Sequence, residues 1–228
     1  MLRLTALITL LLAAPAAAGT VTIGSDLSTP ASSAVSNPTD WNAWNTKLPG
    51  RKFRSPVQGE LNAVRIKGRI DPGGAKPVVS MNVQVLRPKR GGKVQTIVTS
   101  QSLPLPYGGD AQQVSRYGRG DLDLANTRTC VKKGDYVSIF SSGGFSPQYP
   151  MGVPFAFFGD HTGATATVFK GKGGGANGDG KVYRGKPKVG QELLLQAEIG
   201  TGPDARYTCQ TKQQQKHGGQ GRSRAAIA

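Results

Sequence analysis

Two tryptophans lie among amide and carboxylate side chains near the start of the chain, in the run Asp40-Trp41-Asn42-Ala43-Trp44-Asn45. Aromatic rings pack on the C–H surface of a sugar while amide groups bond its hydroxyls, and such a mixture is typical of ligand sites. The run predicts a carbohydrate site made by Trp41, Asn42, Trp44 and Asn45. The alternative is that both tryptophans close one open end of the domain and serve packing alone.

Basic residues gather in three short runs: Arg51-Lys52-Phe53-Arg54, Arg87 to Lys93, and Lys181 to Lys188. The chain has 29 Lys and Arg against 13 Asp and Glu, a formal charge of +16. Such an excess favours anionic surfaces such as wall polymers and acidic polysaccharides, although it could also serve solubility. The candidate anion-binding residues are Arg51, Lys52, Arg54, Arg87, Lys89 and Arg90. Nucleic acid is not the expected partner, because these runs are not interleaved with aromatic residues along one face.

Catalytic signals are sparse. A Ser-His-Asp triad needs a histidine; the chain has only His161 and His217, and it has no G-x-S-x-G motif. We therefore assign no catalytic residue. Glycoside hydrolysis needs only two carboxyl groups, so a hydrolase that uses an Asp/Glu pair stays open as an alternative.

No metal ion or other cofactor is expected. The run Asn177-Gly178-Asp179-Gly180 resembles the oxygen-rich turn of a calcium loop, but it lacks the further aspartates and the glutamate of an EF-hand. With its glycine-rich surroundings, residues 171–180, it predicts a flexible loop between strands. The tripeptide Arg119-Gly120-Asp121 matches a sequence known for integrin recognition, but a three-residue match often occurs by chance. Asp121 is expected to open a strand.

The first 18 residues have the layout of a secretory signal peptide: Arg3, an apolar stretch from Leu4 to Ala14, and three small residues before Gly19. An uncleaved N-terminal anchor is the alternative. No later stretch is apolar for the roughly 20 residues that span a bilayer, so the exported chain has no expected transmembrane segment. Cys130 and Cys209 form an even pair in an oxidising compartment, which predicts one disulfide. The expected location is outside the cell or on its wall.

The rest of the chain predicts an all-β domain. Strict alternation predicts a strand from Val79 to Leu86, with Val94 to Leu103 as its hairpin partner. In the stretch from Leu61 to Ile70 the apolar positions change phase, which a β-bulge would explain. We interpret residues 19–50 as an irregular lead-in, 51–210 as a two-sheet sandwich of jelly-roll type with about nine strands, and 211–228 as a disordered basic tail. Further strands are expected at Leu122 to Leu124, Tyr136 to Phe140, Phe155 to Phe158, Ala164 to Phe169 and Glu192 to Ile199.

Three strand-like runs carry a resemblance: Arg54-Ser55-Pro56-Val57 leading into Val64-Arg65-Ile66-Lys67-Gly68, then Val83-Gln84-Val85-Leu86-Arg87, then Val131-Lys132-Lys133-Gly134-Asp135-Tyr136-Val137. Over residues 51–200 the pattern resembles uncharacterised secreted β-sandwich proteins of high-GC Gram-positive bacteria. The resemblance implies export and a sandwich fold, and it carries no activity or functional residues.

The sequence therefore favours a secreted, non-catalytic protein that binds extracellular glycan or an anionic cell-wall polymer. A polysaccharide hydrolase and a structural protein of the cell surface are the alternatives. The oligomeric state does not follow from the sequence.

Overall fold

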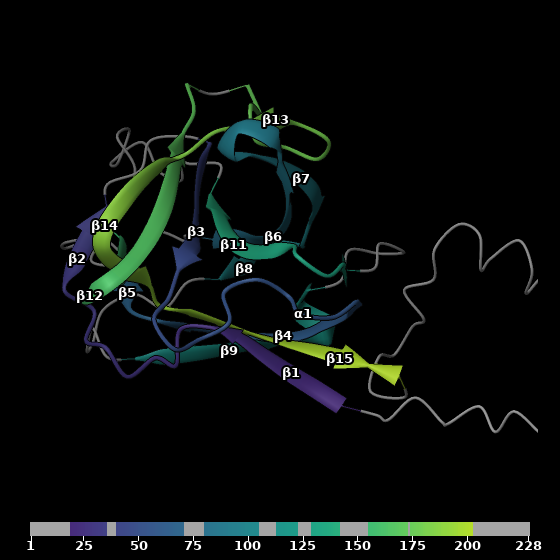
Figure 1. The fold of residues 1–228 in the computed structure, drawn as a ribbon, viewed down its shortest axis with the longest axis horizontal. Coiled ribbons are helices and arrows are strands. Elements are labelled where there is room, and N and C mark those ends of the chain that lie inside the picture. Colours follow the sequence, from purple (N-terminus) through teal and green to yellow (C-terminus); the bar gives the residue numbers. More distant parts are fainter. Residues whose placement is uncertain are drawn as a thin grey trace, which may run out of the picture.

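The computed structural model describes residues 19–35, 40–70, 80–104, 113–122, 129–141, 155–172 and 174–202. These residues form an all-β structure with two antiparallel sheets, as predicted (Figure 1). The smaller sheet has five strands in the order β1-β15-β4-β10, with β9 also paired to β4. Their bounds are β1 Gly19–Gly24, β4 Gly59–Lys67, β9 Val114–Gly118, β10 Cys130–Val131 and β15 Leu195–Thr201.

The larger sheet has ten strands, with the main order β13-β7-β6-β11-β3-β12-β14. These seven are β3 Trp41–Lys47, β6 Ser80–Lys89, β7 Lys93–Thr99, β11 Tyr136–Ser141, β12 Phe155–Lys170, β13 Val182–Tyr183 and β14 Lys186–Leu193. The short strands β2 Ser33–Val35 and β5 Arg69–Ile70 pair with β12, and β8 Leu103–Pro104 pairs with β6. Two single-turn helices complete the described elements: η1 Arg90–Gly92 and α1 Arg119–Leu122.

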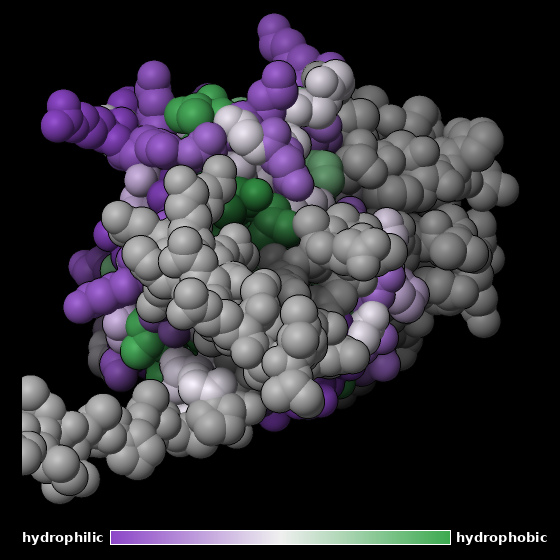
Figure 2. Space-filling view, turned by 90° about the vertical axis from the view of Figure 1, so that its right-hand side faces the viewer, coloured by the Kyte–Doolittle hydropathy of each residue, from purple (hydrophilic) through white to green (hydrophobic). Residues whose placement is uncertain are grey.

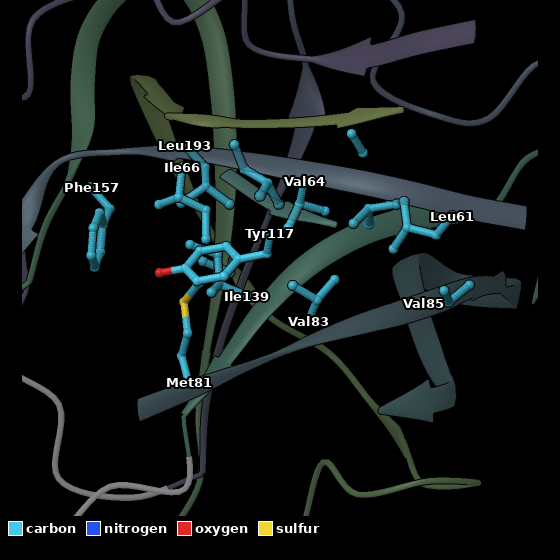
Figure 3. Close-up of a cluster of buried hydrophobic side chains, with 14 of the residues drawn as sticks. Leu61, Val64, Ile66, Met81, Val83, Val85, Tyr117, Ile139, Phe157 and Leu193 are labelled. Atoms are coloured by element: carbon cyan, nitrogen blue, oxygen red, sulfur yellow. The ribbon is translucent and has the colours of Figure 1, made fainter. Parts of the chain in front are cut away.

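The main hydrophobic core lies between the two sheets. In Figure 3 the side chains of β4 point toward those of β6, which belongs to the larger sheet. On β6 the alternating residues Met81, Val83 and Val85 are all buried, as their spacing predicts. They are opposed from β4 by Leu61, Val64 and Ile66, which are also buried.

The predicted hairpin and the predicted bulge are both confirmed. Strands β6 and β7 pair antiparallel and are joined by η1, where Gly91 and Gly92 adopt positive φ values of 71° and 68°. On β4 the pairing with β15 passes from Ala63 to Leu61, leaving Asn62 out of register. This extra residue explains how Leu61 belongs to the same buried cluster as Val64 and Ile66, although three positions separate Leu61 from Val64.

The expectation of an irregular lead-in over residues 19–50 was wrong. This segment contains β1, β2 and β3, and β3 lies inside the larger sheet, between β11 and β12. Strand β3 was missed because of its polar residues, which are buried. Asn45 exchanges two hydrogen bonds of 2.8 Å with the backbone of Leu193. The domain thus includes residues well before Arg51.

Three smaller expectations also need correction. Asp121 lies in α1, where its carboxylate accepts a hydrogen bond from the Gly118 N–H at 2.8 Å, and it does not open a strand. The two strands expected at 155–158 and 164–169 are one strand, β12. The glycine-rich loop is anchored, because the Asn177 carbonyl accepts a hydrogen bond from Thr96 at 2.9 Å and Asn177 is fully buried.

Several expectations fall on residues outside the described ranges: the signal peptide, the basic tail and Cys209. Cys130 begins β10, and no described cysteine is free. The bridge to Cys209 stays a prediction. Within the described ranges, none of the helices combines the length and apolar character that crossing a bilayer requires.

Candidate functional site

The larger sheet curls into a half-barrel because its two edge strands are consecutive in the chain. Only Arg184 and Gly185 connect β13, at one edge, to β14, at the other. A connection of two residues spans at most roughly 11 Å between the flanking Cα atoms, so the two edges must approach one another. Figure 1 shows the resulting ring of strands, with β13 at its top.

The concave face of this half-barrel carries a second hydrophobic cluster. Along β3, Ala43 faces the core between the sheets, whereas Trp44 faces the inside of the half-barrel. Trp44 meets Tyr183 edge to face, with ring centroids 6.2 Å apart. The buried members of the second cluster are Trp44, Leu86, Val94, Tyr136 and Tyr183.

A hollow of about 580 Å³ opens above this cluster, and we call it the basic hollow. Its walls come from the strands of the half-barrel, the η1 turn and the β13–β14 connection. Four of the lining side chains are cationic, and no carboxylate is among them. The lining residues are Trp44, Thr46, Arg54, Pro88, Lys89, Gly91, Gly92, Lys93, Val94, Tyr136, Thr167, Arg184, Gly185 and Pro187.

Arg54 is held in a fixed orientation at one wall of the basic hollow. Its guanidinium lies 4.6 Å from the ring centroid of Tyr136, and it also donates a hydrogen bond to the Tyr136 hydroxyl. The loop that carries Arg54 is fixed by the Ser55 N–H, which donates to the Asp135 carbonyl at 2.9 Å. A guanidinium stacked in this way presents its other N–H groups as a planar fork, which matches a carboxylate or phosphate.

Another wall is built by the η1 turn and the β13–β14 connection. Arg184 donates a hydrogen bond to the Gly91 carbonyl, which ties these two segments together. Gly185 must be a glycine here, because a Cβ atom would lie 2.5 Å from Thr167 Cγ2 and 2.8 Å from Trp44 Cη2. This close approach places Arg184 at the rim, together with Lys89 and Lys93, and all three are exposed.

Two hydroxyl groups add hydrogen-bonding capacity to the floor. The Oγ1 atoms of Thr46 and Thr167 are 3.0 Å apart, on the paired strands β3 and β12. Deeper inside, the Tyr183 hydroxyl contacts Thr96 Oγ1 at 3.2 Å. Burial raises the pKa of Tyr183 above its ordinary value of 10.0, and the hydrogen bond with Thr96 opposes this shift only in part. Tyr183 therefore stays neutral at physiological pH.

A second hollow, of about 440 Å³, adjoins the first, and we call it the lysine hollow. It shares Arg184 and Pro187 with the basic hollow. Its other lining residues are Val168, Phe169, Lys170, Lys186 and Lys188. Figure 2 shows hydrophilic side chains gathered over the upper part of one face, at the height of β13 and β7 in Figure 1, with hydrophobic atoms visible between them.

The structure does not bring the predicted carbohydrate residues together on one surface. Trp41 is 1% exposed in the core between the sheets and meets Phe158 edge to face, with ring centroids 6.1 Å apart. Asn42 and Asn45 are also buried, and Asn42 donates a hydrogen bond to Gln84. Of the four, only Trp44 lines the basic hollow, and at 1% exposure it forms the floor and offers no open ring face. Packing accounts for Trp41, Asn42 and Asn45, which corrects the prediction of an exposed sugar site.

The predicted basic residues divide into three groups. Arg54 and Lys89 line the basic hollow. Arg51 instead pairs with Asp26 and with the buried Glu192, and Arg87 makes two hydrogen bonds to the buried Asp135, at 3.0 and 2.8 Å. Lys52 and Arg90 are exposed and line neither hollow.

Sequence reasoning missed part of the site. Lys93 and Arg184 lie in runs that the charge pattern singled out, but Thr46, Tyr136 and Thr167 gave no signal, because strands far apart in the sequence bring them together.

The described carboxylates lie elsewhere and are engaged in other contacts. Glu192 is fully buried, 3.3 Å from His161 Nδ1 and 3.5 Å from Arg51. Glu198 pairs with Arg65 at 2.6 Å and with Arg116 at 3.4 Å. Asp26 has a lowered pKa: burial opposes the shift, but hydrogen bonds from Ser28 and the charge of Arg51 outweigh it. Among the described residues, no group of three or more His, Cys, Asp and Glu side chains could hold a metal ion.

No protein family, no curated protein and no solved structure matches this chain. The resemblance to secreted β-sandwich proteins of high-GC Gram-positive bacteria therefore stays a prediction.

Proposed function

We propose that this is a secreted, non-catalytic protein that binds an anionic extracellular polymer, such as an acidic glycan or an anionic cell-wall polymer, in the basic hollow of its half-barrel. The observation that carries the proposal is the gathering of unpaired basic side chains around the two hollows. Away from the hollows, Arg51, Arg65, Arg87 and Arg116 each pair with a carboxylate.

Around the two hollows, seven different basic side chains make no ion pair with any described carboxylate. They are Arg54, Lys89, Lys93, Lys170, Arg184, Lys186 and Lys188. Like charges that lie close together reinforce each other's potential, which raises the local concentration of anions. The Thr46 and Thr167 hydroxyls supply further donors and acceptors, as a sugar chain requires.

The hydrolase alternative has no comparable support. Glycoside cleavage requires two carboxyl groups beside the scissile bond, and neither hollow has a carboxylate among its lining residues. A jelly-roll connection of the strands, the finer form of our fold prediction, belongs with this proposal. The antiparallel pairing of β1 with β15, the first and last described strands, supports it.

The test is binding of the full chain to polygalacturonate, a carboxylated glycan, with neutral dextran as the control polymer. We expect binding to polygalacturonate alone, release by about 0.5 M salt, where exposed charges are strongly screened, and weakening by the double change Lys89→Gln and Lys93→Gln. Equal binding to dextran, or binding unaffected by salt and by both substitutions, would contradict the proposal.

A further inference from the structure

The basic hollow and the lysine hollow share part of their walls. Arg184 and Pro187 line both hollows, and these two residues flank Gly185 and Lys186 at the start of β14. A ligand that leaves the basic hollow past Arg184 can therefore reach the lysine hollow along residues that line both. At about 580 and 440 Å³, each hollow has the size of a ligand site of its own.

The two hollows differ in chemistry. The basic hollow has directional groups: the stacked guanidinium of Arg54, the rim contact of Arg184, and two hydroxyls on the floor. The lysine hollow presents Lys170, Lys186 and Lys188, which are flexible point charges without a fixed fork. Lys170 and Lys186 are exposed, whereas Lys188 is half-buried, with Nζ 5.2 Å from the Phe158 ring centroid and 3.3 Å from Gln191 Oε1.

We propose that the two hollows are consecutive subsites of one groove, in which the basic hollow selects the anionic group and the lysine hollow holds the next units of the same chain. This inference rests on the proposed function and deepens it: the ligand is an extended polyanion with charges repeated along its length, and a single acidic sugar fills only one subsite. The second contact is then intramolecular, so spanning both subsites multiplies affinity without new chemistry.

The lysines on β14 have a simpler explanation, and the experiment must distinguish it from the two-subsite groove. β14 is an edge strand of the larger sheet, and lysines on edge strands block pairing with another sheet. If this were their only role, removing them would affect association of the protein with itself and would not change how affinity depends on ligand length.

The experiment measures binding of galacturonic acid oligomers of increasing length to the full chain by calorimetry at low salt. Three variants are compared with the unchanged protein: Arg54→Gln, the pair Lys186→Gln with Lys188→Gln, and a control pair, Lys132→Gln with Lys133→Gln. The control lysines are exposed on the turn before β11 and line neither hollow. Their replacement removes the same charge as the Lys186/Lys188 pair of changes.

For the unchanged protein and the control pair we expect affinity to rise by more than about tenfold once an oligomer spans both subsites. The Lys186/Lys188 pair of changes should abolish this rise and should lower the affinity for short oligomers no more than the control pair does. Arg54→Gln should weaken binding at every length. A gradual rise with length that the Lys186/Lys188 variant shares with the control variant would overturn the two-subsite groove. Binding of no oligomer by the unchanged protein would instead refute the proposed function.

Discussion

Arg87 and Lys89 lie two residues apart on the same strand, and both were candidates for anion binding. The structure gives them different roles. Arg87 donates two hydrogen bonds to Asp135, whose side chain is 2% exposed. Lys89 is exposed at the rim of the basic hollow. We therefore expect Arg87→Met to lower stability while leaving polymer binding unchanged, and Lys89→Met to do the reverse.

The expected loss of stability in Arg87→Met follows from the contacts that the buried Asp135 carboxylate keeps and loses. Without Arg87, the Asp135 carboxylate keeps a hydrogen bond of 2.9 Å from the Lys132 N–H but loses two charge-assisted ones. Removing one partner of a fully buried ion pair costs about 3–5 kcal/mol. The Arg87 side chain is 29% exposed, so water can partly replace it, and we expect a loss of about 2 kcal/mol. For a chain of this length this corresponds to a fall in Tm of about 4–8 °C.

Lys89→Met removes one exposed charge and should change stability by less than about 0.5 kcal/mol. A single exposed charge contact contributes about 0.4–1 kcal/mol, so the affinity for polygalacturonate should fall about two- to fivefold.

Unfolding in urea, followed by the fluorescence of the buried residues Trp41 and Trp44, measures stability. Calorimetry with polygalacturonate measures binding. If Arg87→Met left the unfolding midpoint in place and weakened binding as much as Lys89→Met does, the division into paired and unpaired charges would be refuted.

Two further predictions concern the fold. At Gly68, where φ is +139°, an added Cβ would lie 2.0 Å from the Ala156 carbonyl oxygen, so Gly68→Ala should cost about 3 kcal/mol or more in urea unfolding. Gly50→Ala, with φ +69° and open space, should cost only the backbone strain of about 1–2 kcal/mol. Equal losses would contradict the prediction that the contact with Ala156 adds to the backbone strain. Because burial raises the pKa of Tyr183 above 10.0, the folded state favours its neutral form, and this contribution is complete below pH 10 and is lost as the pH rises through the folded-state pKa. Thermal midpoints measured between pH 9 and 11 should fall more steeply for the unchanged protein than for Tyr183→Phe, and parallel curves would contradict this assignment.

The parts of the fold that the sequence predicted depend on neighbours in the chain. The β6–β7 hairpin follows from alternation on both sides of a glycine-containing turn, and the bulge in β4 follows from a phase change within a few residues. In both cases the pattern and its cause lie in one short segment.

Strand β3 was missed because the partners that permit its burial are remote. Asn42 and Asn45 read as polar surface, yet their hydrogen-bond partners are Gln84 and Leu193. A buried amide costs little free energy when its hydrogen bonds are made, and nothing near Asn45 in the sequence shows that Leu193 will supply them. The same limit applies to the basic hollow, whose lining residues run from Trp44 to Pro187.

Net charge alone does not separate a protein kept soluble by its lysines from one that binds an anion, whereas a gathering of unpaired charge around one hollow favours an anion-binding protein. Charges that serve only solubility can be spread over the whole surface, where mutual repulsion is weak and well screened. Gathering Arg54, Lys89, Lys93 and Arg184 around one hollow raises their repulsion and so lowers the stability of the folded chain. An anionic ligand relieves this cost. The described arginines Arg51 and Arg87, which support loops and turns elsewhere, are neutralised by carboxylates. Exposed residues such as Lys52 and Lys132 carry unpaired charge away from the hollow, so the feature that calls for a ligand is the gathering of four such charges around one hollow.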